Sequence, residues 1–260
     1  MTPAEQAFAQ RYQTWDTLHR QAGAGRSYPY AWRLPELARP LGQASLHRAE
    51  NALSLDLYTL GRFREARAAL SPANISLRAR ALRRRVGLLL DEPATAGAEE
   101  DAMESAYLAY LENRPEAWTA AWPADTTDTD RLWGVVLGIW AVTRGHTVSL
   151  APSHRALNGL RALEPALAAQ AEAVHAETVF RLGPRWAVVW TDHALAQVDL
   201  FSQHHLKARL LGLKAQALEA AGELGEGARF RKLARALAER QEAALYLRLF
   251  IDPARGFSRR

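Results

Sequence analysis

The chain has 260 residues, a formal net charge of +5 and no cysteine, which excludes disulfide bonds and thiolate metal sites. Ala, Leu and Arg, which favour helices, are abundant, whereas the β-branched residues that favour strands are sparse. The most apolar run, Leu132 to Val142, is too short to span a bilayer, and the N-terminus lacks the basic start and apolar core of a signal peptide. We therefore expect an all-α cytoplasmic protein that does not enter a membrane.

The first residues carry the signals of a helix start. Thr2 precedes Pro3, and Glu5 follows Thr2 by three residues, which is the pattern of a capping box with proline at the first helical position. We therefore predict a helix over 3–21 that ends before Gly23.

The segment 26–42 is rich in proline and aromatic residues. Its prolines, Pro29, Pro35 and Pro40, exclude a long regular helix, so a loop is predicted here. The large rings of this loop either pack across the first helices or contact a ligand or peptide. The candidate contact residues are Tyr28, Tyr30 and Trp32.

Further helices are predicted in the N-terminal half over 44–60, 63–70, 75–90 and 97–113, and a short helix over 116–122 follows them. Gly61 makes the turn between the first two. The short helix carries Trp118 and Trp122, whose spacing places both rings on one face. These rings either pack between helices or line a groove that binds a partner.

The C-terminal half has the pattern of helical hairpins separated by glycines. The predicted helices cover 130–144, 153–163, 166–182, 185–200, 206–221 and 226–250. Gly145, Gly183 and Gly222 end helices of this series, and a positive φ is expected at the last two. A polar loop over 123–130 separates the two halves. The predicted domains are therefore residues 1–122 and 130–252, with a basic tail over 253–260.

The turn glycines recur at intervals of about 40 residues, as in helical repeat proteins. YTLGRFREA, from Tyr58 to Ala66, resembles the middle of a tetratricopeptide repeat. The stretch from Leu213 to Leu237 resembles the degenerate form of that repeat in the helical domains of bacterial transcriptional activators and signalling regulators. The resemblance implies antiparallel hairpins stacked as an α-solenoid or right-handed superhelix. It also implies that a concave face binds proteins or peptides.

Motifs for catalysis or metal binding are weak. His175 and Glu177 have the spacing of zinc deaminases, but the cysteines of that signature are missing, and a partly exposed histidine is expected. Adjacent His204 and His205 point in different directions on a helix and do not chelate one ion well. The chain has no phosphate-binding glycine loop and no nucleophile elbow. We therefore expect no catalytic residue, no cofactor and no metal site, although a helical enzyme remains a third alternative.

Charge is distributed unevenly along the chain. The stretch from Val86 to Asp130 holds eleven acidic residues and one basic residue, Arg114, whereas basic residues cluster elsewhere. The basic side chains either contact the phosphates of a nucleic acid or pair with the acidic stretch. The candidate phosphate contacts are Arg78, Arg83, Arg84, Arg85, Arg231, Lys232 and Arg235.

These observations favour a scaffold or regulatory module that binds a protein or peptide partner. A DNA-binding protein that uses its arginine-rich helices is the alternative. No aromatic residue interleaves with the arginine run, however, and base stacking requires such rings. The sequence does not indicate the oligomeric state.

Overall fold

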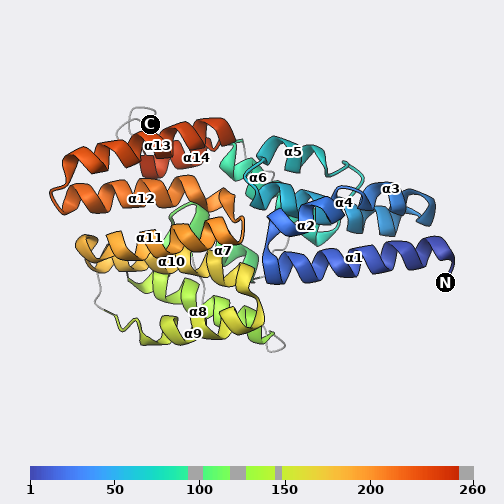
Figure 1. Ribbon diagram of the computed structural model, residues 1–260, viewed down its shortest axis with the longest axis horizontal. Coiled ribbons are helices and arrows are strands. Elements are labelled where there is room, and N and C mark those ends of the chain that lie inside the picture. Colours follow the sequence, from blue (N-terminus) through green and yellow to red (C-terminus); the bar gives the residue numbers. More distant parts are fainter. Residues whose placement is uncertain (93–101, 118–126, 144–147, 252–260) are drawn as a thin grey trace.

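The computed structural model describes residues 1–92, 102–117, 127–143 and 148–251. These residues form helices and connecting turns, and no strand occurs among them (Figure 1). The first part contains α1 (Pro3–Ala22), α2 (Ala24–Ala31), α3 (Leu34–Ala38), η1 (Arg39–Leu41), α4 (Gln43–Thr59), α5 (Phe63–Ala68) and α6 (Leu77–Leu89). The second part contains α7 (Ala102–Leu111), η2 (Pro115–Ala117), α8 (Asp128–Val142), α9 (Ala151–Leu163), α10 (Pro165–Leu182), α11 (Pro184–Leu200), η3 (His204–Leu206), α12 (Lys207–Ala220), α13 (Leu224–Gln241), α14 (Ala244–Tyr246) and η4 (Leu247–Ile251).

The start of α1 is the predicted capping box. The Thr2 side chain accepts a hydrogen bond from the Glu5 backbone at 3.2 Å, and the Glu5 carboxylate accepts one from the Thr2 backbone at 2.6 Å. Two amide groups that the first turn leaves unpaired are thereby satisfied. None of the helices in the described part of the chain combines the length and the apolar character that crossing a bilayer requires.

The loop expected over 26–42 is instead a series of short helices. Pro29 lies inside α2, two residues before that helix ends, whereas Pro35 and Pro40 lie in the first turns of α3 and η1. A proline in a first turn removes no helical hydrogen bond, so Pro35 and Pro40 are compatible with their helices. Pro29 lies beyond the first turn of α2, lacks an amide for a helical hydrogen bond, and is followed by only two more residues of that helix.

Two other predicted boundaries were wrong. The helix expected to start at Ser153 begins at Ala151, so Ser153 lies buried inside its first turn. The helix expected to reach Phe250 ends at Gln241, because Glu242 adopts a left-handed conformation with φ of 57°.

Many helices end with the same hydrogen-bonded turn. At Gly61, the amide of Gly61 donates to the Tyr58 carbonyl and the amide of Arg62 donates to the Leu57 carbonyl, the pair of bonds that defines a Schellman end. The same pattern recurs at other residues with positive φ, namely Asp91, Asn113, Ser202, Gly222 and Glu242. Gly183 also lies between two helices, but its φ of −172° is extended, so the positive φ predicted there was wrong. Gly145 lies outside the described residues.

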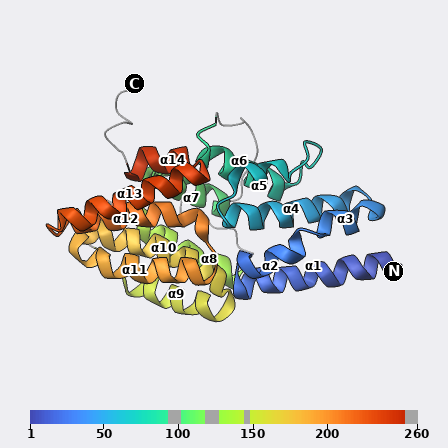
Figure 2. The same cartoon turned by 45° about the horizontal axis from the view of Figure 1, so that its top comes forward.

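The C-terminal helices pack in chain order. α8 lies against α9, α10 against α11 and α12 against α13, and α9 and α11 also contact the helices that follow them (Figure 2). The N-terminal helix α1 packs against α10 as well as against α2. The described helices thus form one body in which segments far apart in sequence are neighbours.

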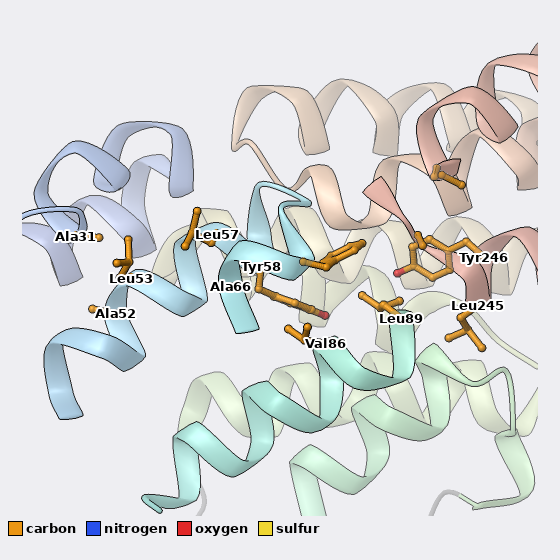
Figure 3. Packing of buried hydrophobic residues seen from close by; sticks show 14 of the residues in the cluster. Ala31, Ala52, Leu53, Leu57, Tyr58, Ala66, Val86, Leu89, Leu245 and Tyr246 are labelled. Carbon is orange, nitrogen blue, oxygen red and sulfur yellow. The ribbon is translucent and has the colours of Figure 1, made fainter. Parts of the chain in front are cut away.

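Two large clusters of buried side chains hold this body together. The first joins α1–α6 to the end of the chain, and Figure 3 shows Tyr58 beside Val86, with Leu245 and Tyr246 near Leu89. The second joins α7–α12 and includes Trp133 and Trp140, which are almost fully buried. α12 belongs to both, because Leu211 packs into the first cluster and Leu210 into the second.

A buried ion pair lies in the second half of the structure. Arg209 of α12 is 1 % exposed, and its Nε and NH2 groups donate to Glu177 Oε2 of α10 at 3.0 and 2.7 Å. Trp140 Nε1 donates to Glu177 Oε1 at 2.9 Å, and Arg209 NH1 donates to the Leu111 carbonyl at 3.2 Å. Burial is the largest influence on the pKa of Arg209 and lowers it, but Glu177, Tyr110 and Tyr246 together outweigh burial, so the pKa is raised and the guanidinium stays charged.

The Gly222→Ala substitution is expected to lower the free energy of unfolding by about 1 kcal/mol, because alanine pays for the left-handed backbone that glycine adopts freely. A Cβ atom at Gly222 would meet no atom within 4 Å, so the cost is conformational alone. The measurement is chemical unfolding of the variant and of the wild type.

The matched control is Gly183→Ala, at an extended residue between α10 and α11. Its Cβ atom would lie 3.1 Å from Cδ1 of Trp186, an exposed ring that can move aside, so a smaller effect is expected. A loss at Gly183 equal to that at Gly222 would contradict the assignment of these two turns.

Candidate partner-binding groove

The aromatic residues of the N-terminal part are only partly available to a partner. Arg62 donates to the Tyr28 hydroxyl at 3.0 Å, and the Arg11 guanidinium lies 5.3 Å from the centroid of the Tyr30 ring. Trp32 is 58 % exposed, with its ring centroid 6.1 Å from that of Tyr28, and is the most exposed member of this group. Trp118 and Trp122 lie outside the described residues.

Several candidate phosphate contacts are instead tied to the protein itself. Arg83 donates to the carbonyls of Ser71 and Asn74, and Arg85 Nε donates to Glu104 Oε1 at 2.8 Å. Arg231 pairs with Glu219. Arg84 and Arg235 also have interaction partners, whereas Arg78 and Lys232 are exposed, with no ion pair to the described residues. The predicted basic cluster is therefore divided between structural and free side chains, and Arg85 pairs with the acidic stretch.

A groove lies where the turn between α4 and α5 meets the C-terminal half of α13. It has a volume of about 780 Å³. Its apolar lining residues are Leu60, Phe63, Leu211, Leu233, Ala236 and Leu237. Leu233 is 47 % exposed, so the groove presents to solvent an apolar side chain of the size that an interface buries. Neither the aromatic nor the phosphate predictions from the sequence fall on this lining.

The turn at Gly61 shapes one wall of the groove. Gly61 has φ of +75°, and a Cβ atom on it would lie 2.2 Å from Nε2 of Gln241. Glycine is therefore required here both by the backbone and by the close approach of the Gln241 amide. Gln241 Nε2 donates to the His204 carbonyl at 2.9 Å, but Gln241 Oε1 is buried without a hydrogen-bond partner.

The charged side chains of the groove differ in whether they have partners. Arg62 pairs with Glu65 and Arg64 pairs with Glu242, both within the groove lining. Lys207 pairs at 2.6 Å with Asp199, which lies outside the lining. Arg240 is exposed, and no acidic residue of the described chain forms an ion pair with it.

Histidine at the groove is neutral near physiological pH. Burial is the largest influence on His204 and lowers its pKa, and nearby Lys207 and Arg240 lower it further against the opposing effect of Asp199. The positive charge that the groove offers to a partner is therefore that of Arg240 together with the paired cations.

A second hollow, of about 640 Å³, adjoins the groove. The two share the paired residues Arg64 and Glu242, and the second is lined further by Arg67, Glu92 and Leu247 among others. The surface hollowed between α5 and the end of α13 thus has the volume to receive more than one residue of a partner chain.

A buried cluster of serine and histidine offers a different kind of chemistry. Ser153 Oγ lies 2.9 Å from His175 Nδ1, and His154 Nε2 lies 3.0 Å from His175 Nε2. The expectation of a partly exposed His175 was wrong, because His175 is 0 % exposed, packed edge-on against the Trp190 ring. Ser153 is also buried, and neither residue lines the groove or its neighbouring hollow.

The other histidines do not assemble a metal site in the described residues, where no group of three or more His, Cys, Asp or Glu side chains could hold an ion. His193 Nδ1 lies 2.6 Å from Glu172 Oε2, and His205 Nε2 lies 3.1 Å from the Tyr107 hydroxyl. These contacts join helices and orient side chains.

Comparisons with protein-family models, with curated proteins and with solved structures returned no match to this chain. The groove is therefore interpreted from its own residues.

Two buried histidines make stability depend on pH. Burial is the main cause that lowers the pKa of His175 to about 4 and that of His205 to about 3, from the ordinary value of 6.5. Between the ordinary and the lowered pKa values the unfolded chain binds more protons than the folded chain, so acid favours unfolding. We expect the free energy of unfolding to fall by up to about 1.4 kcal/mol per histidine for each pH unit below about 6.5.

The measurement is urea unfolding at several pH values between neutrality and about pH 5, with the wild type and the His175→Gln and His205→Gln variants. Each variant should show a shallower dependence on pH than the wild type in this window. An unchanged slope in both variants would mean that these histidines do not resist protonation in the fold.

Proposed function

We propose that this protein is an interaction module, a scaffold or a regulator, that binds a segment of a partner protein in the groove between α5 and α13. The observation that carries the proposal is the apolar floor formed by exposed Leu233 and half-buried Leu237, bordered by charged side chains and by a cation without an acidic partner in the described chain. An apolar centre with a polar rim is the usual composition of a protein–protein interface.

The helical arrangement supports the same proposal. We infer a tetratricopeptide-like array from the consecutive hairpins α8–α9, α10–α11 and α12–α13, which pack in chain order. Within it, Arg209 and Glu177 are covered by other parts of the chain, since the Arg209 guanidinium lies 3.9 Å from the Tyr110 ring centroid and 4.1 Å from that of Phe250. This part of α10 and α12 is already occupied, which favours the groove as the partner site.

The proposal is tested by selecting short peptides from an unbiased displayed library on the wild-type protein. The Leu233→Asp variant should bind the selected peptides about tenfold more weakly or worse, because it places a charge on the apolar floor. Affinities are measured by fluorescence anisotropy.

Leu224→Asp is the matched control, because Leu224 is 67 % exposed on the same helix and does not line the groove. The partner would bind elsewhere on the protein if both variants lost affinity for the peptides to the same extent. The same conclusion would follow if both variants bound the peptides as tightly as the wild type.

DNA binding is the alternative function, and the exposed arginines at the start of α6 are its best support. Arg78 and Arg80 are exposed there, whereas Arg83 and Arg85 hold internal hydrogen bonds. A fair test therefore replaces Arg78 and Arg80, since removing the other two would disturb the fold. We expect only weak duplex binding, which is lost between about 50 and 200 mM salt. Submicromolar binding at the higher salt that is lost in Arg78→Ala/Arg80→Ala would favour the DNA-binding alternative.

A further inference from the structure

We propose that the groove receives an acidic protein segment that carries a leucine-sized apolar residue. The apolar residue would pack on Leu233 and Leu237, and a carboxylate would pair with Arg240. The inference rests on the proposed function and specifies the chemistry of the partner.

The pairing of the groove cations supports an acidic partner. Arg62 and Arg64 already have carboxylate partners within the lining, and Lys207 has one outside it. Arg240 alone among the basic groups of the lining stands without an acidic partner in the described chain. A carboxylate from a partner can therefore bind at Arg240 without breaking an internal ion pair. A basic segment would find Glu65 and Glu242 neutralised and would face Arg240 as a like charge.

The order of residues along α13 supports a segment with both apolar and acidic side chains. Leu233, Leu237 and Arg240 follow one another at helical spacing, so they lie on one side of α13 and all line the groove. The apolar floor and the free cation are thus neighbours. A partner that satisfies both must place an apolar and an acidic residue within a few positions of each other.

Nucleic acid is a poorer occupant of the same groove. Its backbone requires several free cations in a row, whereas the lining offers one together with two carboxylates. Phosphate would have to compete with Glu65 and Glu242 for Arg62 and Arg64.

The test uses two displayed peptide libraries of about ten residues, each with a fixed leucine. One varies its other positions among Asp, Glu, Ser and Ala, and the other among Lys, Arg, Ser and Ala. The wild type should enrich only the acidic library. Selected peptides should bind Arg240→Glu about tenfold more weakly, and a copy with lysine in place of its acids should recover affinity for that variant.

The matched control is Lys232→Glu, because Lys232 is also exposed on α13 with no ion pair to the described residues but does not line the groove. It should change affinity far less than Arg240→Glu. Since Arg240 is likewise exposed, its replacement should leave the fold intact, which thermal unfolding verifies.

The outcomes separate the two proposals. Peptides that depend on Leu233 but not on Arg240, or enrichment of the basic library, would overturn the acidic segment and leave the interaction module standing. Both proposals would be overturned if neither these two libraries nor the unbiased library yielded a peptide whose affinity falls in the Leu233→Asp variant.

Discussion

The ion pair between Glu177 and Arg209 is the contact on which the second half of the structure depends. Taking two charges out of water costs several kcal/mol for each, and the cost is offset only when the geometry is good and the remaining hydrogen-bonding groups are satisfied. Here Glu177 accepts bonds from Trp140, Arg181 and Arg209, so α8, α10 and α12 converge on one carboxylate. Losing either partner would leave a buried charge uncompensated, a defect of about 3–5 kcal/mol. The pair therefore specifies one packing of these helices.

The same pair reaches the groove through the end of the chain. The Phe250 ring stacks on Arg209, and the Phe250 and Ile251 carbonyls accept hydrogen bonds from Gln216 and Arg231 at 2.7 Å. These contacts fix η4 and so the direction in which the chain leaves α13. That departure occurs at Glu242, whose left-handed turn follows Gln241 directly and whose carboxylate pairs with Arg64 of α5. The buried ion pair and the turn that ends α13 are thus connected through η4.

Local sequence signals were sufficient to predict the helices but not all of the turns between them. The capping box at Thr2 and the glycine turns at Gly61 and Gly222 were readable, because each depends on residues near in sequence. The left-handed turns at Asp91, Asn113, Ser202 and Glu242 were missed. Serine and glutamate adopt that backbone rarely, whereas asparagine and aspartate adopt it more readily, so Asn113 and Asp91 carried a local signal. Gly183 shows the converse, since a glycine at a helix end need not have a positive φ.

The candidate site was less predictable than the fold, because its lining combines three distant stretches, 60–65, 204–211 and 233–242. One signal in the sequence could have predicted the buried ion pair. Arg209 stands three residues after Leu206 and four before Leu213, within the apolar stripe of its helix, and a charge at such a position indicates a buried partner.

The basic composition of the chain is a poor guide to its partner once the pairs are known. A net charge of +5 suggests a polyanion, yet Arg85, Arg209 and Arg231 are each held by a carboxylate of the same chain. What decides the partner is the charge left unpaired and what surrounds it. Arg240 stands beside an apolar floor, where the lower local polarity strengthens one well-placed ion pair and offers nothing to a long run of phosphates. A short segment that carries one apolar and one acidic side chain satisfies that environment with few residues.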